Sequence, residues 1–116
     1  MLTALGSANV LLCVQHVDLR KSFDGLCALV ESVFQRNVFE GHLFLFVNKR
    51  RDRLKALWWD QDGLVIWYKR LEGGCFELPR NVADRTHVTL DATALAMLLG
   101  GVPMTTPRRK RYARAV

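Results

Sequence analysis

The fold is decided by the stretch LFLFVNKRRDRLKALWWDQDGLVIWYKRL, residues 43–71. It contains three runs rich in Phe, Trp, Val, Ile and Tyr, at residues 43–48, 54–60 and 64–71, and polar residues separate them. Runs of this composition are typical of β-strands. Asp62 and Gly63 between the last two runs favour a tight hairpin, because both residue types readily adopt a positive φ angle. We therefore expect an antiparallel β-meander.

The register of this hairpin predicts two different faces. If Asp62 and Gly63 form the loop, Trp58 lies opposite Trp67 and Lys55 lies opposite Arg70. One face, which we expect to pack on a long helix, then carries Leu54, Ala56, Trp58, Val65, Trp67, Lys69 and Leu71. The other face carries Lys55, Leu57, Trp59, Ile66, Tyr68 and Arg70. Both faces have an apolar centre and need a cover. We expect the C-terminal helix to be the second cover, with a twin subunit or another protein as the alternatives.

The flanking segments predict the helices. Residues 10–14 are typical of a first strand. Asp18 is the expected N-cap of the long amphipathic helix that follows, and Gly25 indicates that something packs closely against it. The apolar face of this helix shows helical spacing and comprises Leu19, Phe23, Leu26, Cys27, Val30, Val33 and Phe34. Residues 87–90 are expected to be extended, and Asp91 should cap a short helix over residues 92–99.

These elements predict an α+β fold. It consists of an antiparallel meander of about four to five strands packed against one long amphipathic helix, plus a short C-terminal helix. With 116 residues, we expect a single domain over residues 1–103. Residues 104–116 form a basic tail without apolar periodicity, which we expect to be disordered.

Composition limits the environment of the protein. No run of apolar residues approaches the length of a membrane span, and the N-terminus does not resemble a secretory signal, so we expect a cytoplasmic protein without membrane contact. Cys13, Cys27 and Cys75 match no metal-binding spacing and are expected to be buried, reduced thiols. We predict no metal and no cofactor.

The positive charge is concentrated in two places. The chain has a net charge of +6, and residues 49–55 (KRRDRLK) hold five bases and one acid. A second group near the C-terminus comprises Arg108, Arg109, Lys110, Arg111 and Arg114. Such clusters favour a phosphate-bearing partner, although a solvated loop and tail would show the same charge pattern.

No arrangement of residues indicates catalysis. His16, His42 and His87 are isolated, and motifs of metalloproteases, serine hydrolases or P-loop proteins are absent from the sequence. Asp60 and Asp62 fit an ordinary role in a turn. We therefore predict a protein that is not an enzyme and has no catalytic residues. A small basic RNase that uses His16 or His42 is the weakest of the alternatives.

Four ordered motifs closely resemble one family. They are DLRKSFDGL at 18–26, GHLFLFVNKRRDRLKAL at 41–57, WDQDG at 59–63 and WYKRLEGGCF at 67–76. The family is that of the small accessory protein TnpB, from the insertion sequence sixty-six group of bacterial transposable elements. The resemblance spans roughly residues 10–100, and it departs from the family pattern mildly at Leu19, Val38 and Trp58. It implies a role in DNA transposition beside a companion small protein and a larger transposase that carries the strand-transfer chemistry.

The leading hypothesis is therefore a non-enzymatic accessory protein that contacts DNA, the transposase, or both. The partners that follow are DNA at the transposon ends, the transposase and the companion protein, and a homo-oligomer is possible. Bases that we expect to neutralise phosphates are Arg20, Lys21, Lys49, Arg50, Arg51, Arg53, Lys55, Lys69, Arg70, Arg108, Arg109, Lys110 and Arg111. Trp59 and Tyr68 are expected to stack on bases or to contact a partner. The alternative is a pure protein–protein interaction module that bridges transposase and companion protein without touching DNA.

Overall fold

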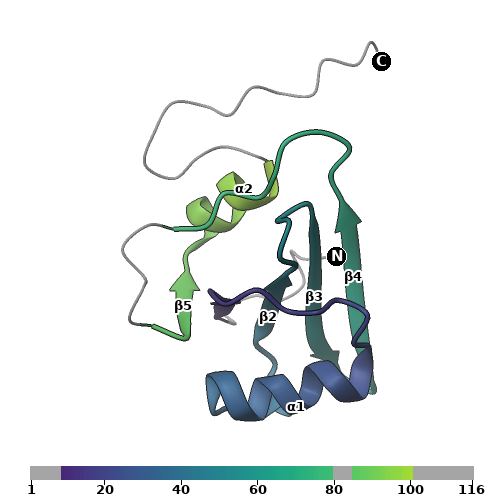
Figure 1. Cartoon of the computed structure of the whole chain (residues 1–116). Coiled ribbons are helices and arrows are strands. Elements are labelled where there is room, and N and C mark those ends of the chain that lie inside the picture. The colour runs from purple at the N-terminus through teal and green to yellow at the C-terminus, as the bar shows by residue number, and fades with distance from the viewer. Residues whose placement is uncertain (1–8, 80–84, 101–116) are drawn as a thin grey trace.

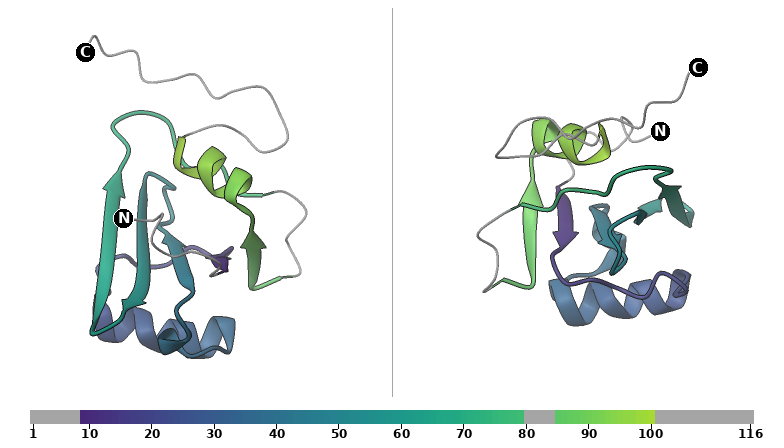
Figure 2. Two further views of the ribbon diagram at one scale, coloured as in Figure 1. Left: turned by 180° about the vertical axis from the view of Figure 1, so that it is seen from behind. Right: turned by 45° about the horizontal axis from the view of Figure 1, so that its top comes forward.

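A computed structural model describes residues 9–79 and 85–100 of the chain. These residues contain one five-stranded sheet with a helix on each side (Figures 1 and 2). The elements in chain order are β1 (Val10–Cys13), α1 (Phe23–Phe34), the 3₁₀ turn η2 (Val38–Glu40), β2 (Leu43–Val47), β3 (Arg53–Asp60), β4 (Gly63–Arg70), β5 (His87–Leu90) and α2 (Ala92–Gly100). The strand order is β4-β3-β2-β1-β5. The expected α+β class is confirmed, and no helix in the described ranges is long and apolar enough to cross a bilayer.

The sheet is mixed, so the prediction of a purely antiparallel sheet is wrong. β2, β3 and β4 form the expected antiparallel meander, but β1 pairs with β2 in parallel, with Val10 beside Leu43. Parallel neighbours need a crossover that returns the chain to the same end of the sheet. Here α1 lies in that crossover, and with 12 residues it is of ordinary length. β5 then pairs antiparallel with β1 on its other side.

Each face of the sheet is covered by a helix from the same chain. Leu26, Val30 and Phe34 of α1 pack in one cluster with Phe44 and Leu57. On the opposite face, a second cluster joins Leu12, Leu45, Trp58, Phe76 and Leu98, the last of these from α2. The prediction that the chain supplies both covers is therefore confirmed.

The assignment of helices to faces is reversed from the expectation. Ala56 and Trp58 lie under α2, whereas Leu57 and Ile66 lie on the side of α1. The side on which α1 packs is set by the handedness of the β1–β2 crossover, which is almost always right-handed. The hairpin sequence alone carries no information about that crossover.

The register of the β3–β4 hairpin also differs from the expectation. Asp60 pairs with Gly63, Trp58 with Val65, Lys55 with Tyr68 and Arg53 with Arg70. The loop is therefore formed by Gln61 and Asp62, and Gln61 takes the positive φ angle, at 60°. Because the register is shifted by two residues, each side chain stays on its predicted face while its cross-strand neighbour changes.

The two helices begin differently. Asp91 caps α2 as predicted, because its Oδ1 accepts a hydrogen bond from the Ala94 N–H at 2.7 Å. The expected N-cap role of Asp18 is wrong, because α1 begins only at Phe23 and Asp18 bonds Arg20 instead. Gly25 accommodates the loop before the helix, since a Cβ there would lie 3.1 Å from the Cβ of Lys21.

The cysteines are free, but only part of the expectation about their burial is correct. Cys13 is buried, and this burial raises the pKa of its thiol. Cys27 and Cys75 are half-buried. The predicted basic tail lies outside the described residues.

Candidate functional site

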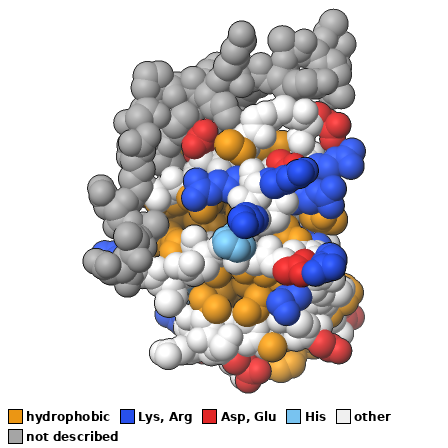
Figure 3. All heavy atoms as spheres, in the orientation of Figure 1, with side chains coloured by type: hydrophobic (Ala, Val, Ile, Leu, Met, Phe, Trp, Pro, Cys, Tyr) orange, Lys and Arg blue, Asp and Glu red, His pale blue; other side chains and the backbone are white. Residues whose placement is uncertain are grey.

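An open hollow of about 780 Å³ lies where three segments meet. They are the loop between β1 and α1, the turn between β2 and β3, and the adjoining ends of β3 and β4. We call this feature the basic hollow. It is lined by His16, Val17, Asp18, Leu19, Arg20, Asn48, Lys49, Arg50, Asp52, Arg53, Lys55 and Tyr68. Figure 3 shows Lys and Arg side chains gathered around a histidine on one face of the molecule.

The turn between β2 and β3 is held together by Asn48. Its Oδ1 accepts hydrogen bonds from the backbone N–H groups of Asp52 and Arg53, at 3.1 and 3.0 Å. Its Nδ2 donates to Asp52 Oδ1 at 2.7 Å. Asn and Asp commonly close turns in this way. The side-chain bonds fix the turn and leave Lys49 and Arg50 exposed on it.

The loop before α1 is attached to the sheet by two contacts. The Val17 N–H donates to the Val47 carbonyl at 2.9 Å, and the Val17 side chain is buried. Lys55 Nζ donates to the Lys21 carbonyl at 2.8 Å. The loop is thereby brought against the ends of β2 and β3, which forms the second wall of the hollow.

Tyr68 lies at the edge of the basic hollow between two cations. The Lys55 ammonium lies 4.9 Å from the centre of the Tyr68 ring, and Arg53 Nη1 donates to the Tyr68 hydroxyl at 3.2 Å. Lys55 is only 9% exposed, so its ammonium acts mainly as an internal clamp. Tyr68 itself is 48% exposed and offers ring surface to solvent.

The charge in the hollow is only partly compensated. Arg20 pairs with Asp18 at 2.6 Å, and Arg70 pairs with Glu72 at 2.9 Å in an adjoining smaller hollow that Arg53 and Tyr68 also line. Among residues 9–79 and 85–100, Lys49, Arg50 and Arg53 have no carboxylate oxygen within 4.0 Å. These three cations line the same hollow as the exposed Tyr68 ring, and so does Asp52, whose pKa is lowered by the hydrogen bond from the Asn48 side chain and by the charges of Arg53 and Arg50.

The hollow unites five of the thirteen bases predicted from the sequence. Arg20, Lys49, Arg50, Arg53 and Lys55 line it, and Arg70 lies in the adjoining hollow. Lys21 and Arg51 are exposed nearby but do not line either hollow, and Arg108, Arg109, Lys110 and Arg111 lie outside the described residues.

Lys69 and Trp59 lie apart from the hollow. Lys69 Nζ donates to the Leu99 carbonyl at 3.3 Å, near the C-terminal end of α2, where a cation is favourable. Trp59 lies at the hairpin end of β3 and packs edge-on against Phe39, with 4.8 Å between ring centres. Tyr68 and Trp59 therefore do not form one stacking surface.

Six lining residues are not among the predicted DNA-binding or stacking residues: His16, Val17, Asp18, Leu19, Asn48 and Asp52. Asn48 directly precedes the KRRD turn, a position where asparagine indicates a side-chain-closed turn. His16 shows no such pattern. It lies near the end of β2, whereas His42 precedes the start of that strand, so the two histidines of the RNase alternative lie far apart.

The Asp18–Arg20 pair predicts an acid-resistant contact in the hollow. Hydrogen bonds from the Arg20 side chain and backbone lower the pKa of Asp18 from 3.8 to about 2. A lowered folded-state pKa means that the contact stabilises the fold above pH 3.8 and is lost as the pH falls toward 2. An NMR titration of the Asp18 carboxyl carbon should show this midpoint, and Arg20→Ala should return it toward 3.8. An unchanged midpoint in Arg20→Ala would contradict the pairing.

Comparisons with known proteins agree with the four sequence motifs. The model of the family described as "IS66 Orf2 like protein" matches residues 8–109. The "Uncharacterized protein y4jC" of Sinorhizobium fredii is 33% identical over 106 residues, which cover 91% of this chain and 89% of that protein. The "Uncharacterized protein y4hO" of the same organism is 30% identical, with 93% and 92% covered. No solved structure matches the chain. The predicted resemblance is confirmed, and the chain belongs to the IS66 Orf2-like (TnpB) family of insertion sequence accessory proteins.

Proposed function

We propose that this accessory protein contacts the DNA of its element through the basic hollow and does not itself catalyse a reaction. The observation that carries the proposal is that Lys49, Arg50 and Arg53, none of which has a carboxylate oxygen within 4.0 Å among the described residues, line the same hollow as the exposed ring of Tyr68. Cations without carboxylate partners remain available to phosphate groups, and phosphate contacts provide affinity with little sequence preference.

The position of Tyr68 favours single-stranded or distorted DNA. Lys55 and Arg53 hold the ring in place, and about half of its surface remains exposed. An unpaired base can stack on such a ring while neighbouring phosphates meet Lys49 and Arg50. Unpaired bases are to be expected at the ends of an element during its excision or insertion. The bases Arg108, Arg109, Lys110 and Arg111 of the tail would add further sequence-independent attraction.

Binding measurements across a salt series test this proposal. The full chain is titrated with single-stranded and duplex oligonucleotides of the element ends, from ~50 mM salt upward. Arg50→Ala should weaken binding about tenfold and lower the salt slope by about one, because one phosphate contact is lost. Tyr68→Ala should weaken single-strand binding by about 1–3 kcal/mol and affect duplex binding less.

The matched control is Arg36→Ala. Arg36 is also exposed, but it lies 3.9 Å from Glu40 and does not line the hollow. Its replacement should leave affinity and salt slope within error of the unmodified chain. Undetectable binding of both oligonucleotides at ~50 mM salt would overturn the proposed DNA contact.

A second candidate function is docking on the transposase or the companion protein without DNA contact. Phe39 favours it, because this ring is 60% exposed and packs against Trp59 at the end of the sheet opposite the hollow. In a co-purification of the three element proteins, Phe39→Ala or Trp59→Ala should then abolish association, whereas Tyr68→Ala, which alters the hollow at the other end of the sheet, should not. Arg50→Ala combined with Arg51→Ala should leave association intact, and the reverse pattern would count against docking.

A further inference from the structure

β4 forms one edge of the sheet and has few of the features that usually protect an edge strand, because its charged residues, Lys69 and Arg70, lie only at its C-terminal end. It pairs with β3 over eight consecutive positions without interruption, and it contains no proline. All of its residues are half-buried or exposed, although its central run LVIW is apolar. In the described part of the chain, no strand pairs with its outer side. Natural proteins usually shorten, bend or interrupt such an edge, because it readily accepts another strand.

The backbone groups that point outward from β4 can be identified. The Leu71 N–H donates inward, to the Asp52 carbonyl at 2.7 Å. Leu71 directly follows β4, and because backbone direction alternates along a strand, the odd-numbered residues of β4 also direct their N–H and C=O groups toward β3. Leu64, Ile66 and Tyr68 therefore direct their N–H and C=O groups to the outer side.

We propose that β4 of a second copy of this chain pairs antiparallel with this edge, around a two-fold axis at Ile66. Outward-pointing residues must lie opposite outward-pointing residues, so only registers that match even-numbered residues are possible. With the axis at Ile66, Leu64 lies opposite Tyr68 of the second copy. The pairing forms about six backbone hydrogen bonds and continues the sheet across both copies.

Charge complementarity selects this register. Asp62 lies just before β4 and Arg70 at its end, and both are exposed. In the proposed register each Asp62 lies opposite Arg70 of the second copy, and the two-fold symmetry repeats this contact. Arg70 bonds Glu72 of its own chain through Nε at 2.9 Å, so Asp62 of the second copy would share an exposed guanidinium with Glu72. Opposite charges across a strand pair are favourable, whereas shifting the axis by one residue to either side removes this match.

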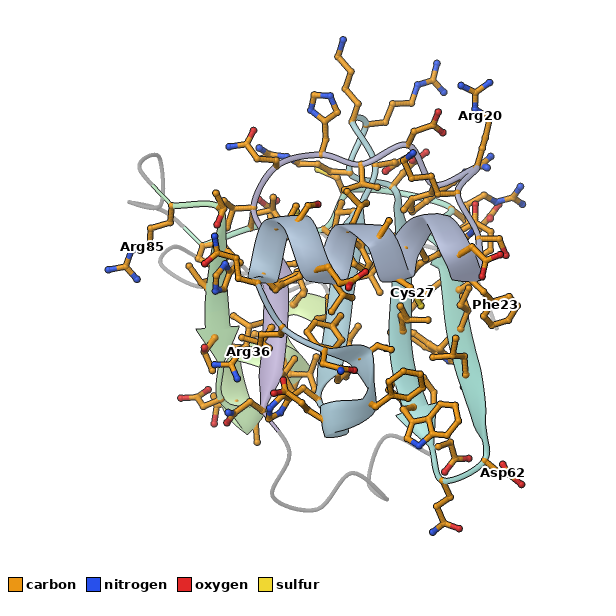
Figure 4. All side chains as sticks on the ribbon, turned by 90° about the horizontal axis from the view of Figure 1, so that it is seen from below. Arg20, Phe23, Cys27, Arg36, Asp62 and Arg85 are labelled. Atoms are coloured by element: carbon orange, nitrogen blue, oxygen red, sulfur yellow. The ribbon has the colours of Figure 1, made fainter. Side chains whose placement is uncertain are left out.

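An exposed aromatic residue lies at the same edge. Phe23, the first residue of α1, is 43% exposed, and Figure 4 shows it beside the outer side of β4. α1 covers the sheet face that carries Ile66, so a second copy continuing the sheet would cover part of this ring. Burial of apolar area would add to the backbone pairing.

Sedimentation equilibrium of the full chain over a concentration series tests this pairing. The unmodified chain should dimerise, and Asp62→Arg or Arg70→Asp alone should raise the dimer dissociation constant tenfold or more. The double variant should restore at least part of the loss, because it exchanges the two charges. Glu31→Arg, the same charge change on the exposed side of α1, is the control and should have no effect. A monomer at every concentration, or a dimer insensitive to Asp62→Arg, would overturn the proposal.

Amide hydrogen exchange locates the interface independently of these variants. Raising the protein concentration should slow exchange at the N–H groups of Leu64, Ile66 and Tyr68. Exchange at Val65 and Trp67, which face β3, should change much less. A dimer in which the three even-numbered amides exchange at a concentration-independent rate would show that another surface forms the interface, and would refute the pairing through β4.

Discussion

Replacing Phe34 by alanine should lower the free energy of unfolding by about 3–5 kcal/mol, the cost typical of removing a buried phenylalanine. The Phe34 ring is 3% exposed and packs against Phe44, Phe46 and His87, with ring centres 5.1, 5.7 and 5.1 Å away. It therefore joins α1 to the centre of the sheet and to β5. Domains of this size have a total free energy of unfolding of roughly 5–15 kcal/mol. We therefore expect a large fraction of the Phe34→Ala protein to be unfolded already at low urea concentration.

The control for this prediction is on the same helix. Phe23 begins α1 and is 43% exposed, so Phe23→Ala removes a ring of the same size with little loss of buried contact. Its cost should be below about 1 kcal/mol in urea unfolding of dilute protein. Equal costs for the two variants would mean that α1 does not pack on the sheet through Phe34.

Replacing Lys55 by alanine should lower the free energy of unfolding by about 2–3 kcal/mol, an unusually large effect for a lysine. Its Nζ donates to the Lys21 carbonyl at 2.8 Å, and its ammonium lies over the Tyr68 ring. The truncation removes the donor, the cation and the buried methylene groups together. The loop before α1 would then lose one of the two hydrogen bonds that join it to β2 and β3.

Lys55→Met separates these contributions. Methionine keeps a side chain of similar length and removes only the charged donor, so its cost should be smaller, about 1–2 kcal/mol. Lys49→Ala, which changes an exposed lysine of the same hollow, should stay within about 0.5 kcal/mol of the unmodified chain. If Lys55→Ala lowered the free energy of unfolding as little as Lys49→Ala, this result would contradict a stabilising contact of the Lys55 ammonium with the Lys21 carbonyl and the Tyr68 ring. The ammonium would then be free to bind a ligand.

The local elements of this fold could be predicted from the sequence because local patterns determine them. The apolar spacing around Leu26 and Val30 indicates α1, and Asp91 indicates the start of α2. The β2–β3–β4 meander follows from adjacent strands and short turns. The parallel pairing of β1 with β2 could not be predicted in this way, because it depends on the path that α1 takes over the sheet.

The hairpin register shows a finer limit. Asp-Gly is a favourable pair for a two-residue loop, yet Gln61 and Asp62 form the loop and Gly63 begins β4. In the observed register Trp58 lies opposite Val65 and Trp67 lies opposite Ala56, so each indole faces a smaller side chain across the strands. The predicted assignment of side chains to the two faces of the hairpin remains correct, because an offset of two residues preserves the alternation of side chains along a strand.

The part of the candidate site that comes from a single segment of the chain could be predicted from the sequence. Lys49 and Arg50 lie in the turn between β2 and β3 and Arg53 begins β3, so their clustering in the sequence predicts their clustering in space. Lys69 and Trp59 could not be placed, because α2 and Phe39 lie 30 and 20 residues away from them in the chain. The buried role of Lys55 could not be predicted either. Its partner is the backbone carbonyl of Lys21, and a backbone carbonyl is present at every residue whatever the sequence.

The place of β1 between β2 and β5 has a consequence for biosynthesis. β2, its neighbour on one side, follows β1 in the chain after a single α-helix. β5, its neighbour on the other side, is much farther along the chain and pairs His87 with Cys13. While the chain grows on the ribosome, the backbone groups of β1 that face β5 stay unpaired until residue 90 has been synthesised. Premature termination before that point would leave this flank bare in the nascent product, which makes truncated copies prone to aggregate.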